Sequence, residues 1–126
     1  MIVADTDVLI DFLAGAEPMA ARVARELERG QMCTTAISRF ELLAGARSKR
    51  QHVAVNRLLA ALPTLPLDEP AADRAAGIRR ELEAAGATIG MADCLIAGIV
   101  LNRESLLLTR NRRQFERVAG LRLAGE

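Results

Sequence analysis

The chain has 126 residues, of which 51% are hydrophobic and 26% charged, and its formal net charge is +1. This length is enough for one hydrophobic core, and the composition excludes a disordered or fibrous chain. Only three aromatic residues are present, all phenylalanine, which disfavours a platform that stacks single-stranded bases. A net charge near zero does not by itself indicate a nucleic-acid ligand. We therefore expect a single domain over residues 1–126.

The two cysteines, Cys33 and Cys94, each lie within an apolar run, and no secretory signal precedes the first predicted strand. This pattern is typical of buried free thiols in a reducing compartment rather than of a disulfide or a zinc site. The longest uninterrupted apolar run, 94–101, is too short to cross a bilayer. We expect a soluble cytoplasmic protein with no membrane association.

Apolar runs and helical patterns alternate along the chain. The first run, residues 2–4, predicts a buried strand, and the apolar positions from 8 to 13 predict a helix directly after it. Further strands are predicted at 31–35, around 65–67, at 105–109 and, more weakly, at 121–123. Further helices are predicted at 19–29, from 38 onward, and over about 49–62, 70–85, 91–101 and 111–118.

Three positions in these helices carry more specific predictions. Ser38 is expected to open its helix, Glu26 to lie on a polar face, and Ala85 to lie on a buried face. The helix at 91–101 is apolar nearly all round, so we expect it to pack against the sheet and to be covered on its other side.

Short strands that alternate with helices predict an α/β fold with three layers, in which helices cover both faces of a mostly parallel sheet. Connections between parallel strands are right-handed, so each helix runs back antiparallel to the strand it follows. The carboxyl edge of the sheet therefore receives the strand ends and the starts of the returning helices. Open sheets of this kind bind ligands at that edge, where the strand order reverses.

Four polar residues are predicted at the carboxyl edge. Asp5 ends the first strand, and Asn111 follows the fourth strand. Glu41 lies in the first turn of the helix after the second strand, and Asp93 lies in the first turn of the helix before the fourth strand. Three acids gathered there would raise one another's pKa values unless a cation lay between them. Oxygen ligands without a nearby histidine or cysteine suit Mg²⁺ or Mn²⁺ rather than zinc.

Helix capping is the competing explanation for each of these residues. Ser38 with Glu41 fits a capping box, Asp93 is favoured near a helix start by the macrodipole, and Asp5 and Asn111 fit N-cap positions. Capping is the commoner explanation for each residue alone, whereas four such coincidences at one edge are less common. Asp93 is the most informative, because residues 90–97 are otherwise apolar and an unpaired acid there is costly.

Four segments, taken together and in order, resemble the PIN-domain family, and most closely the VapC-type toxins of bacterial toxin–antitoxin pairs. They are Val-Ala-Asp-Thr-Asp-Val-Leu-Ile (3–10), Ser-Arg-Phe-Glu-Leu-Leu-Ala-Gly (38–45), Gly-Met-Ala-Asp-Cys-Leu-Ile-Ala (90–97) and Leu-Thr-Arg-Asn-Arg-Arg-Gln-Phe-Glu-Arg-Val (108–118). No single segment is specific, but the resemblance covers the chain from end to end.

The resemblance implies a five-stranded sheet in the order 3-2-1-4-5 and an endoribonuclease that depends on Mg²⁺ or Mn²⁺. It also implies a homodimer that is held inactive by a cognate VapB-like antitoxin whose tail lies over the active-site groove. Asp5, Glu41 and Asp93 match the three acids of the family, and Thr109 matches a frequent threonine. Asn111 matches a fourth polar position where many members have Asp, so one anion is missing and a tightly held second metal is in doubt.

The mechanism implied is metal-assisted hydrolysis of RNA phosphodiester bonds. From residue 103 onward the chain has six arginines and three glutamates, and Arg110, Arg112 and Arg113 lie nearly together. This cluster predicts weak RNA phosphate contacts, although a solvated helix face is the commoner explanation. His52 is the only histidine, which excludes an acid–base pair of two histidines.

Two alternatives remain at this point. The first segment also resembles the nucleophile motif of haloacid-dehalogenase-like phosphatases, but the only lysine, Lys49, lies in the wrong region for that family. The other is a PIN-like module that binds RNA or a partner without cleaving. Asp7 and Asp11 are predicted to cap or to support the site rather than to bind metal. Four apolar residues are predicted to help form the groove for the antitoxin tail: Phe12, Leu13, Leu42 and Leu43.

Overall fold

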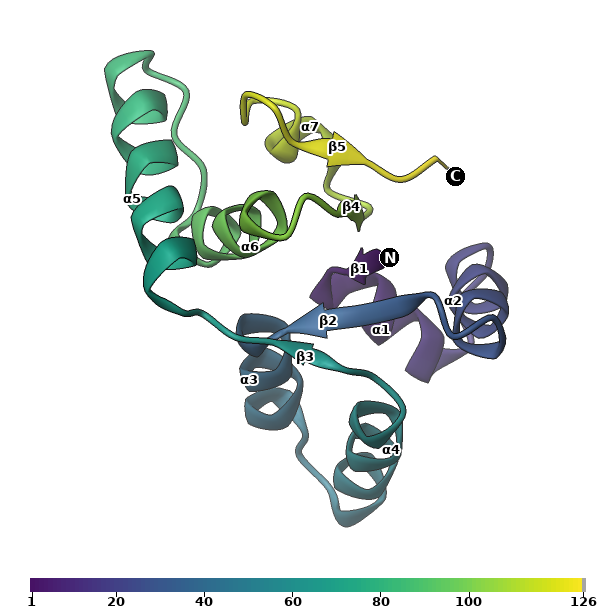
Figure 1. The fold of residues 1–126 in the computed structure, drawn as a ribbon. Coiled ribbons are helices and arrows are strands. Elements are labelled where there is room, and N and C mark those ends of the chain that lie inside the picture. The colour runs from purple at the N-terminus through teal and green to yellow at the C-terminus, as the bar shows by residue number, and fades with distance from the viewer. Residues whose placement is uncertain (126) are drawn as a thin grey trace.

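Five short strands form one parallel sheet in the order β3-β2-β1-β4-β5 (Figure 1). The computed structural model describes residues 1–125, so Glu126, one of the three C-terminal glutamates counted above, lies outside the described residues. The predicted α/β class and the strand order are confirmed. The strands are β1 (Ile2–Ala4), β2 (Met32–Thr35), β3 (Thr64–Leu65), β4 (Leu106–Leu108) and β5 (Arg122–Leu123).

Helices cover both faces of this sheet and complete the three layers. They are α1 (Thr6–Ala14), α2 (Met19–Glu28), α3 (Ala36–Gly45), α4 (Lys49–Ala60), α5 (Glu69–Ala84), α6 (Met91–Asn102) and α7 (Arg112–Phe115). Buried side chains of α1 to α4 pack on one face and those of α5 to α7 on the other (Figure 1). No helix among residues 1–125 is long and apolar enough to span a membrane.

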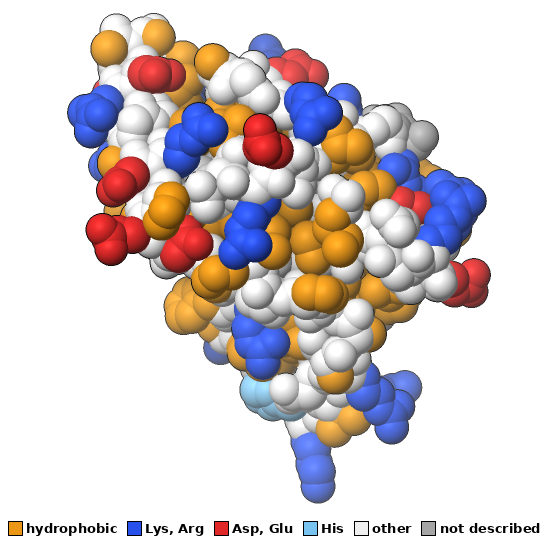
Figure 2. All heavy atoms as spheres, viewed as in Figure 1, with side chains coloured by type: hydrophobic (Ala, Val, Ile, Leu, Met, Phe, Trp, Pro, Cys, Tyr) orange, Lys and Arg blue, Asp and Glu red, His pale blue; other side chains and the backbone are white. Residues whose placement is uncertain are grey.

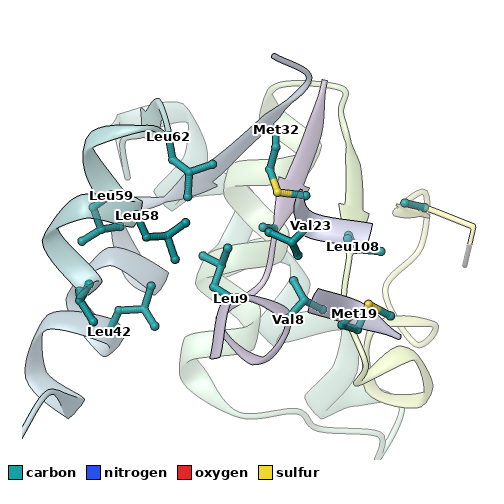
Figure 3. Close-up of a cluster of buried hydrophobic side chains, with 13 residues drawn as sticks. Val8, Leu9, Met19, Val23, Met32, Leu42, Leu58, Leu59, Leu62 and Leu108 are labelled. Atoms are coloured by element: carbon teal, nitrogen blue, oxygen red, sulfur yellow. The ribbon is translucent and has the colours of Figure 1, made fainter. Parts of the chain in front are cut away.

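The strands supply alternate side chains to the two cores. Val3 pairs with Cys33 and with Leu107, and this row packs against α5 to α7. The next pair along, Ala4 and Leu108, faces the opposite core, which also holds Val8, Leu9 and Val23 from α1 and α2 (Figure 3). Because both faces of a parallel sheet are covered, the inner strands β1 and β4 are apolar throughout, as the sequence predicted.

Helix α6 lies between the sheet and α5, as its nearly uniform apolar sequence predicted. Its buried residues include Ile96, Ala97, Ile99 and Val100. Gly98 marks the closest approach to α5, because a Cβ atom there would lie 2.7 Å from the Ala71 carbonyl oxygen and 2.8 Å from the Ala75 backbone nitrogen. Only glycine therefore fits at this crossing.

Three local predictions were wrong. Helix α3 begins at Ala36 rather than Ser38, because Thr35 is its N-cap and the Thr35 hydroxyl accepts a hydrogen bond from the Ser38 backbone N–H at 3.1 Å. Glu26 is 5% exposed instead of facing solvent, and its carboxylate lies 3.3 Å from Arg29. Ala85 is exposed, because α5 ends at Ala84 before that position turns inward.

Candidate active site

The carboxyl ends of β1 and β4 bring Asp5 and Thr109 together. The Asp5 backbone N–H donates to the Leu108 carbonyl at 3.0 Å, so both chains leave the sheet side by side. The Thr109 hydroxyl donates to Asp5 Oδ2 at 2.7 Å, and the Thr6 backbone N–H donates to Asp5 Oδ1 at 2.8 Å. Asp5 is thus the N-cap of α1 and a buried carboxylate at the strand edge at the same time.

Burial raises the pKa of Asp5 from its ordinary value of 3.8 to about 6. Hydrogen bonds from Thr109 and Thr6 oppose this change, while the charges of Asp7 and Asp93 add to it. Within residues 1–125 no arginine, lysine or histidine forms an ion pair with Asp5. Asp5 is therefore a buried acid whose charge no cation of the described chain balances.

Asp93 approaches the same edge from the first turn of α6. Burial is the largest cause that raises the pKa of Asp93, followed by the charges of Glu41 and Asp7. The Asn111 side-chain amide donates to Asp93 Oδ2 at 3.5 Å, and its backbone N–H donates to the Thr109 hydroxyl at 2.9 Å. The structure thus places acids from three distant segments within range of one another's charge.

Glu41 is held by a short chain of hydroxyl groups. It lies one turn deeper in α3 than predicted, because the helix starts earlier. The Thr6 hydroxyl lies 2.6 Å from Glu41 Oε1 and 2.8 Å from the Ser38 hydroxyl. Since Thr6 has a single proton to donate to the carboxylate, Ser38 donates to Thr6. The capping-box explanation of Glu41 is wrong, because Thr35 occupies the cap.

Asp7 and Asp11 on α1 hold the segment that follows β4. The Asp7 carboxylate accepts from the Arg110 backbone N–H at 3.1 Å, and burial is the largest cause that raises the pKa of Asp7. Asp11 Oδ2 lies 2.8 Å from Arg110 Nε, so this acid forms an ion pair. Both residues therefore fix the position of Thr109 and Asn111.

The three arginines of the predicted RNA-contacting cluster have different partners in the structure, and their contact with RNA stays a prediction. Arg110 is paired with Asp11, and Arg112 donates to the Ala124 carbonyl at 2.7 Å. Arg113 is exposed, and its side chain forms no hydrogen bond or ion pair with any described residue. Two of the three arginines thus stabilise the fold.

The chemistry of this site fits a hard divalent cation. Its donors are carboxylate, hydroxyl and amide oxygens, and a bound cation would neutralise the buried charge of Asp5. In the present side-chain arrangement no three His, Cys, Asp or Glu residues of the described chain are placed to hold one ion together. Thr6 contacts Oε1 of Glu41 and Asn111 contacts Oδ2 of Asp93. The other oxygen of each carboxylate is left for an ion, so binding a metal requires these side chains to shift while keeping their present partners.

A groove of about 430 Å³ extends from the site between α1, α3 and α4. Glu41 and Arg50 line it together with apolar side chains, among them Leu13 and Leu42 as predicted. Phe12 and Leu43 do not line the groove, and they pack instead against the core on this face of the sheet.

Three residues of the site were missed from the sequence: Thr6, Ser38 and Arg50. Thr6 follows the first carboxylate, and Ser38 precedes Glu41 by three residues, so hydroxyls next to the acids were a usable signal. Arg50 had no such signal, because its place in the groove depends on how α4 packs against α1 and α3.

Residues 2–121 match the PIN domain family model, and the chain belongs to this family. The dehalogenase-like alternative is therefore wrong. A relative from Shigella flexneri, named tRNA(fMet)-specific endonuclease VapC, is 33% identical over 94% of this chain and 92% of its own length. Ribonuclease VapC11 from Mycobacterium tuberculosis is 30% identical over 88% of this chain and 87% of its own length.

The fold is also that of solved VapBC structures. DNA-bound VapBC from Salmonella typhimurium superimposes with a TM-score of 0.87 and 31% identity, covering 98% of this chain and 96% of the other. VapBC2 from Rickettsia felis, bound to a promoter DNA fragment, has the same TM-score at 22% identity and 98% coverage of both chains, which supports the fold alone.

Proposed function

We propose that this protein is a VapC-type ribonuclease toxin that hydrolyses RNA phosphodiester bonds with Mg²⁺ or Mn²⁺. The observation that carries the proposal is Asp5, a buried carboxylate with a raised pKa at the strand edge, surrounded by other acids and balanced by no cation of the described chain. The relatives named as endonuclease or ribonuclease align over most of the chain and support the reaction class.

Asp5, Glu41 and Asp93 would hold the ion. When bound, the ion supplies charge neutralisation for the phosphate and an acidified water as nucleophile. Thr109 orients Asp5, and Thr6 orients Glu41. The Asn111 side-chain amide donates a hydrogen bond to Asp93 without adding a charge. Burial of Thr109 and Asp5 limits bulk water at this edge, which strengthens the electrostatic interactions there.

A cleavage assay tests the proposal. Wild-type protein is incubated with tRNA(fMet), the substrate in the name of the Shigella relative, and with a mixed RNA pool, each with Mn²⁺ or EDTA. We expect cleavage only with metal, and its loss in Asp5→Asn. Asp73→Asn makes the same change at an exposed position of α5 and serves as control. Equal activity of wild type and Asp5→Asn would leave the non-catalytic binding module as the better interpretation.

We also propose that a VapB-like antitoxin neutralises the protein by placing an amphipathic tail in the groove. The groove is mostly apolar, Glu41 is among its lining residues, and its residue Ile10 remains 50% exposed. The similar solved structures from Rickettsia felis and Salmonella typhimurium are of VapBC. Ile10→Glu should abolish antitoxin binding in calorimetry, whereas Val53→Glu, a change at a similarly exposed residue outside the groove, should not. Loss of binding in both variants, or in neither, would place the tail elsewhere.

We also propose that the protein forms a homodimer. Phe40 and Met91 are the most exposed large hydrophobic side chains, at 69% and 63%, and a second copy is the partner that would cover such residues in a toxin without its antitoxin. Light scattering should give a dimer mass for wild type and a monomer mass for Phe40→Glu. A monomeric wild type would exclude the dimer.

A further inference from the structure

The charge of the chain is unevenly distributed. Residues 36–62, which form α3, α4 and the turn between them, contain five Lys and Arg residues and one acid, Glu41. The other 99 residues contain 12 Lys and Arg against 15 acids, so the segment has a formal charge of +4 and the remainder −3. We call this segment the basic arm. The overall net charge of +1 conceals it.

The five cationic side chains of the basic arm are available to a ligand. All are exposed, and none forms a hydrogen bond or ion pair with a described residue: Arg39, Arg47, Lys49, Arg50 and Arg57. The C-terminal arginines differ, because most of them are engaged within the fold. Arg117 and Arg122, for example, donate to the backbone carbonyls of Thr88 and Glu104.

The basic arm is continuous with the active site. Arg50, in the first turn of α4, lines the same groove as Glu41. The turn between α3 and α4 lies at the end of the molecule opposite α5 (Figure 1), and that end shows blue side chains without red ones in Figure 2. A polyanion bound along this groove would contact Arg50, and the other four cations lie on the same two helices and the turn between them.

We propose that the basic arm binds the phosphate backbone of single-stranded RNA on one side of the cleaved bond. This inference rests on the proposed function and names where its substrate is held. Cations spread over two helices suit a chain of regularly spaced phosphates. The arm contains only one aromatic residue, Phe40, so base stacking contributes little and binding depends strongly on salt.

A binding measurement tests this inference separately from cleavage. The dissociation constant of a fluorescein-labelled single-stranded RNA is measured by anisotropy at several KCl concentrations, with Asp5→Asn present in every variant to prevent hydrolysis. The arm variant is Lys49→Gln/Arg50→Gln. It should fold, because cations are unfavourable at the N-terminus of α4. The matched control is Arg74→Gln/Arg80→Gln, two exposed arginines of α5.

Loss of two phosphate contacts should reduce the slope of log Kd against log salt by about 1.4 and weaken binding about tenfold near physiological salt. The control should bind like the parent. The inference is overturned if the arm variant also binds like the parent, or if it binds RNA normally but loses the antitoxin, which would make the arm a protein-binding surface. A different result would separate the two proposals. If wild type does not cleave RNA but Lys49→Gln/Arg50→Gln still binds RNA more weakly, the proposed ribonuclease activity is wrong and the RNA-binding role of the basic arm stands.

Discussion

Asp5→Asn should stabilise the metal-free protein at neutral pH. Burial raises the pKa of Asp5 from 3.8 to about 6. A change of that size corresponds to about 3 kcal/mol in the free energy of unfolding. Folded protein binds the Asp5 proton more tightly than the unfolded chain does, so ionisation of Asp5 destabilises the folded protein. This penalty reaches its full size above about pH 6. This penalty decreases as the pH falls from about 6 and is absent below about 4.

Asparagine removes the charge and keeps a side-chain oxygen for the Thr6 backbone N–H, so the cap of α1 is retained. We expect the free energy of unfolding of Asp5→Asn to be higher than that of wild type by up to about 3 kcal/mol at pH 7. The two proteins should have equal stability near pH 4. Urea unfolding in EDTA, followed by circular dichroism at both pH values, measures this difference. Asp73→Asn, at an exposed position, should show no such pH-dependent gain.

Addition of Mn²⁺ extends the same measurement. The ion should raise the melting temperature of wild type more than that of Asp5→Asn, because a cation relieves the penalty that the substitution has already removed. A variant that is less stable than wild type at pH 7 in EDTA, or a difference that does not change with pH, would refute the reasoning. In that case the hydrogen bonds from Thr109 and Thr6 balance the charge of Asp5 without a metal.

Three further predictions concern other parts of the fold and site. Thr6→Val should weaken Mn²⁺ binding about tenfold in calorimetry, because it removes the hydroxyl that holds Glu41. Thr6→Ser keeps a hydroxyl and should bind Mn²⁺ like wild type. Equal Mn²⁺ affinity of the two variants would exclude a role of Thr6 in positioning Glu41. Gly98→Ala should destabilise the protein by about 1–3 kcal/mol in urea unfolding, because α5 backbone lies within contact distance. Gly77→Ala, with open space around it in α5, should be neutral or stabilising, and similar losses in both would contradict the packing argument. Asn111→Asp should tighten Mn²⁺ binding and lower metal-free stability, both measurable by thermal shift, since it adds a fourth anion beside Asp93.

The sequence by itself determined the elements and the edge at which the acids meet. Runs such as 2–4 and 106–108 are apolar because both faces of the sheet are covered, and right-handed connections then place Asp5 and the start of α6 at the same edge. The strand order followed from the resemblance of four segments rather than from periodicity. These features depend on short stretches of chain and on general rules of connection, so a single sequence contains them.

Only the tertiary structure decided which side chains are engaged with one another. Arg110 was predicted to contact RNA phosphates, and the structure shows that it also pairs with Asp11, a residue 99 positions away in the chain. Glu26 is buried on a face that its helix pattern marks as polar, and Thr35 takes the cap that Ser38 was expected to form. Burial and pairing depend on residues distant in sequence, whereas periodicity and capping preferences are local, so these contacts could not be predicted from the sequence.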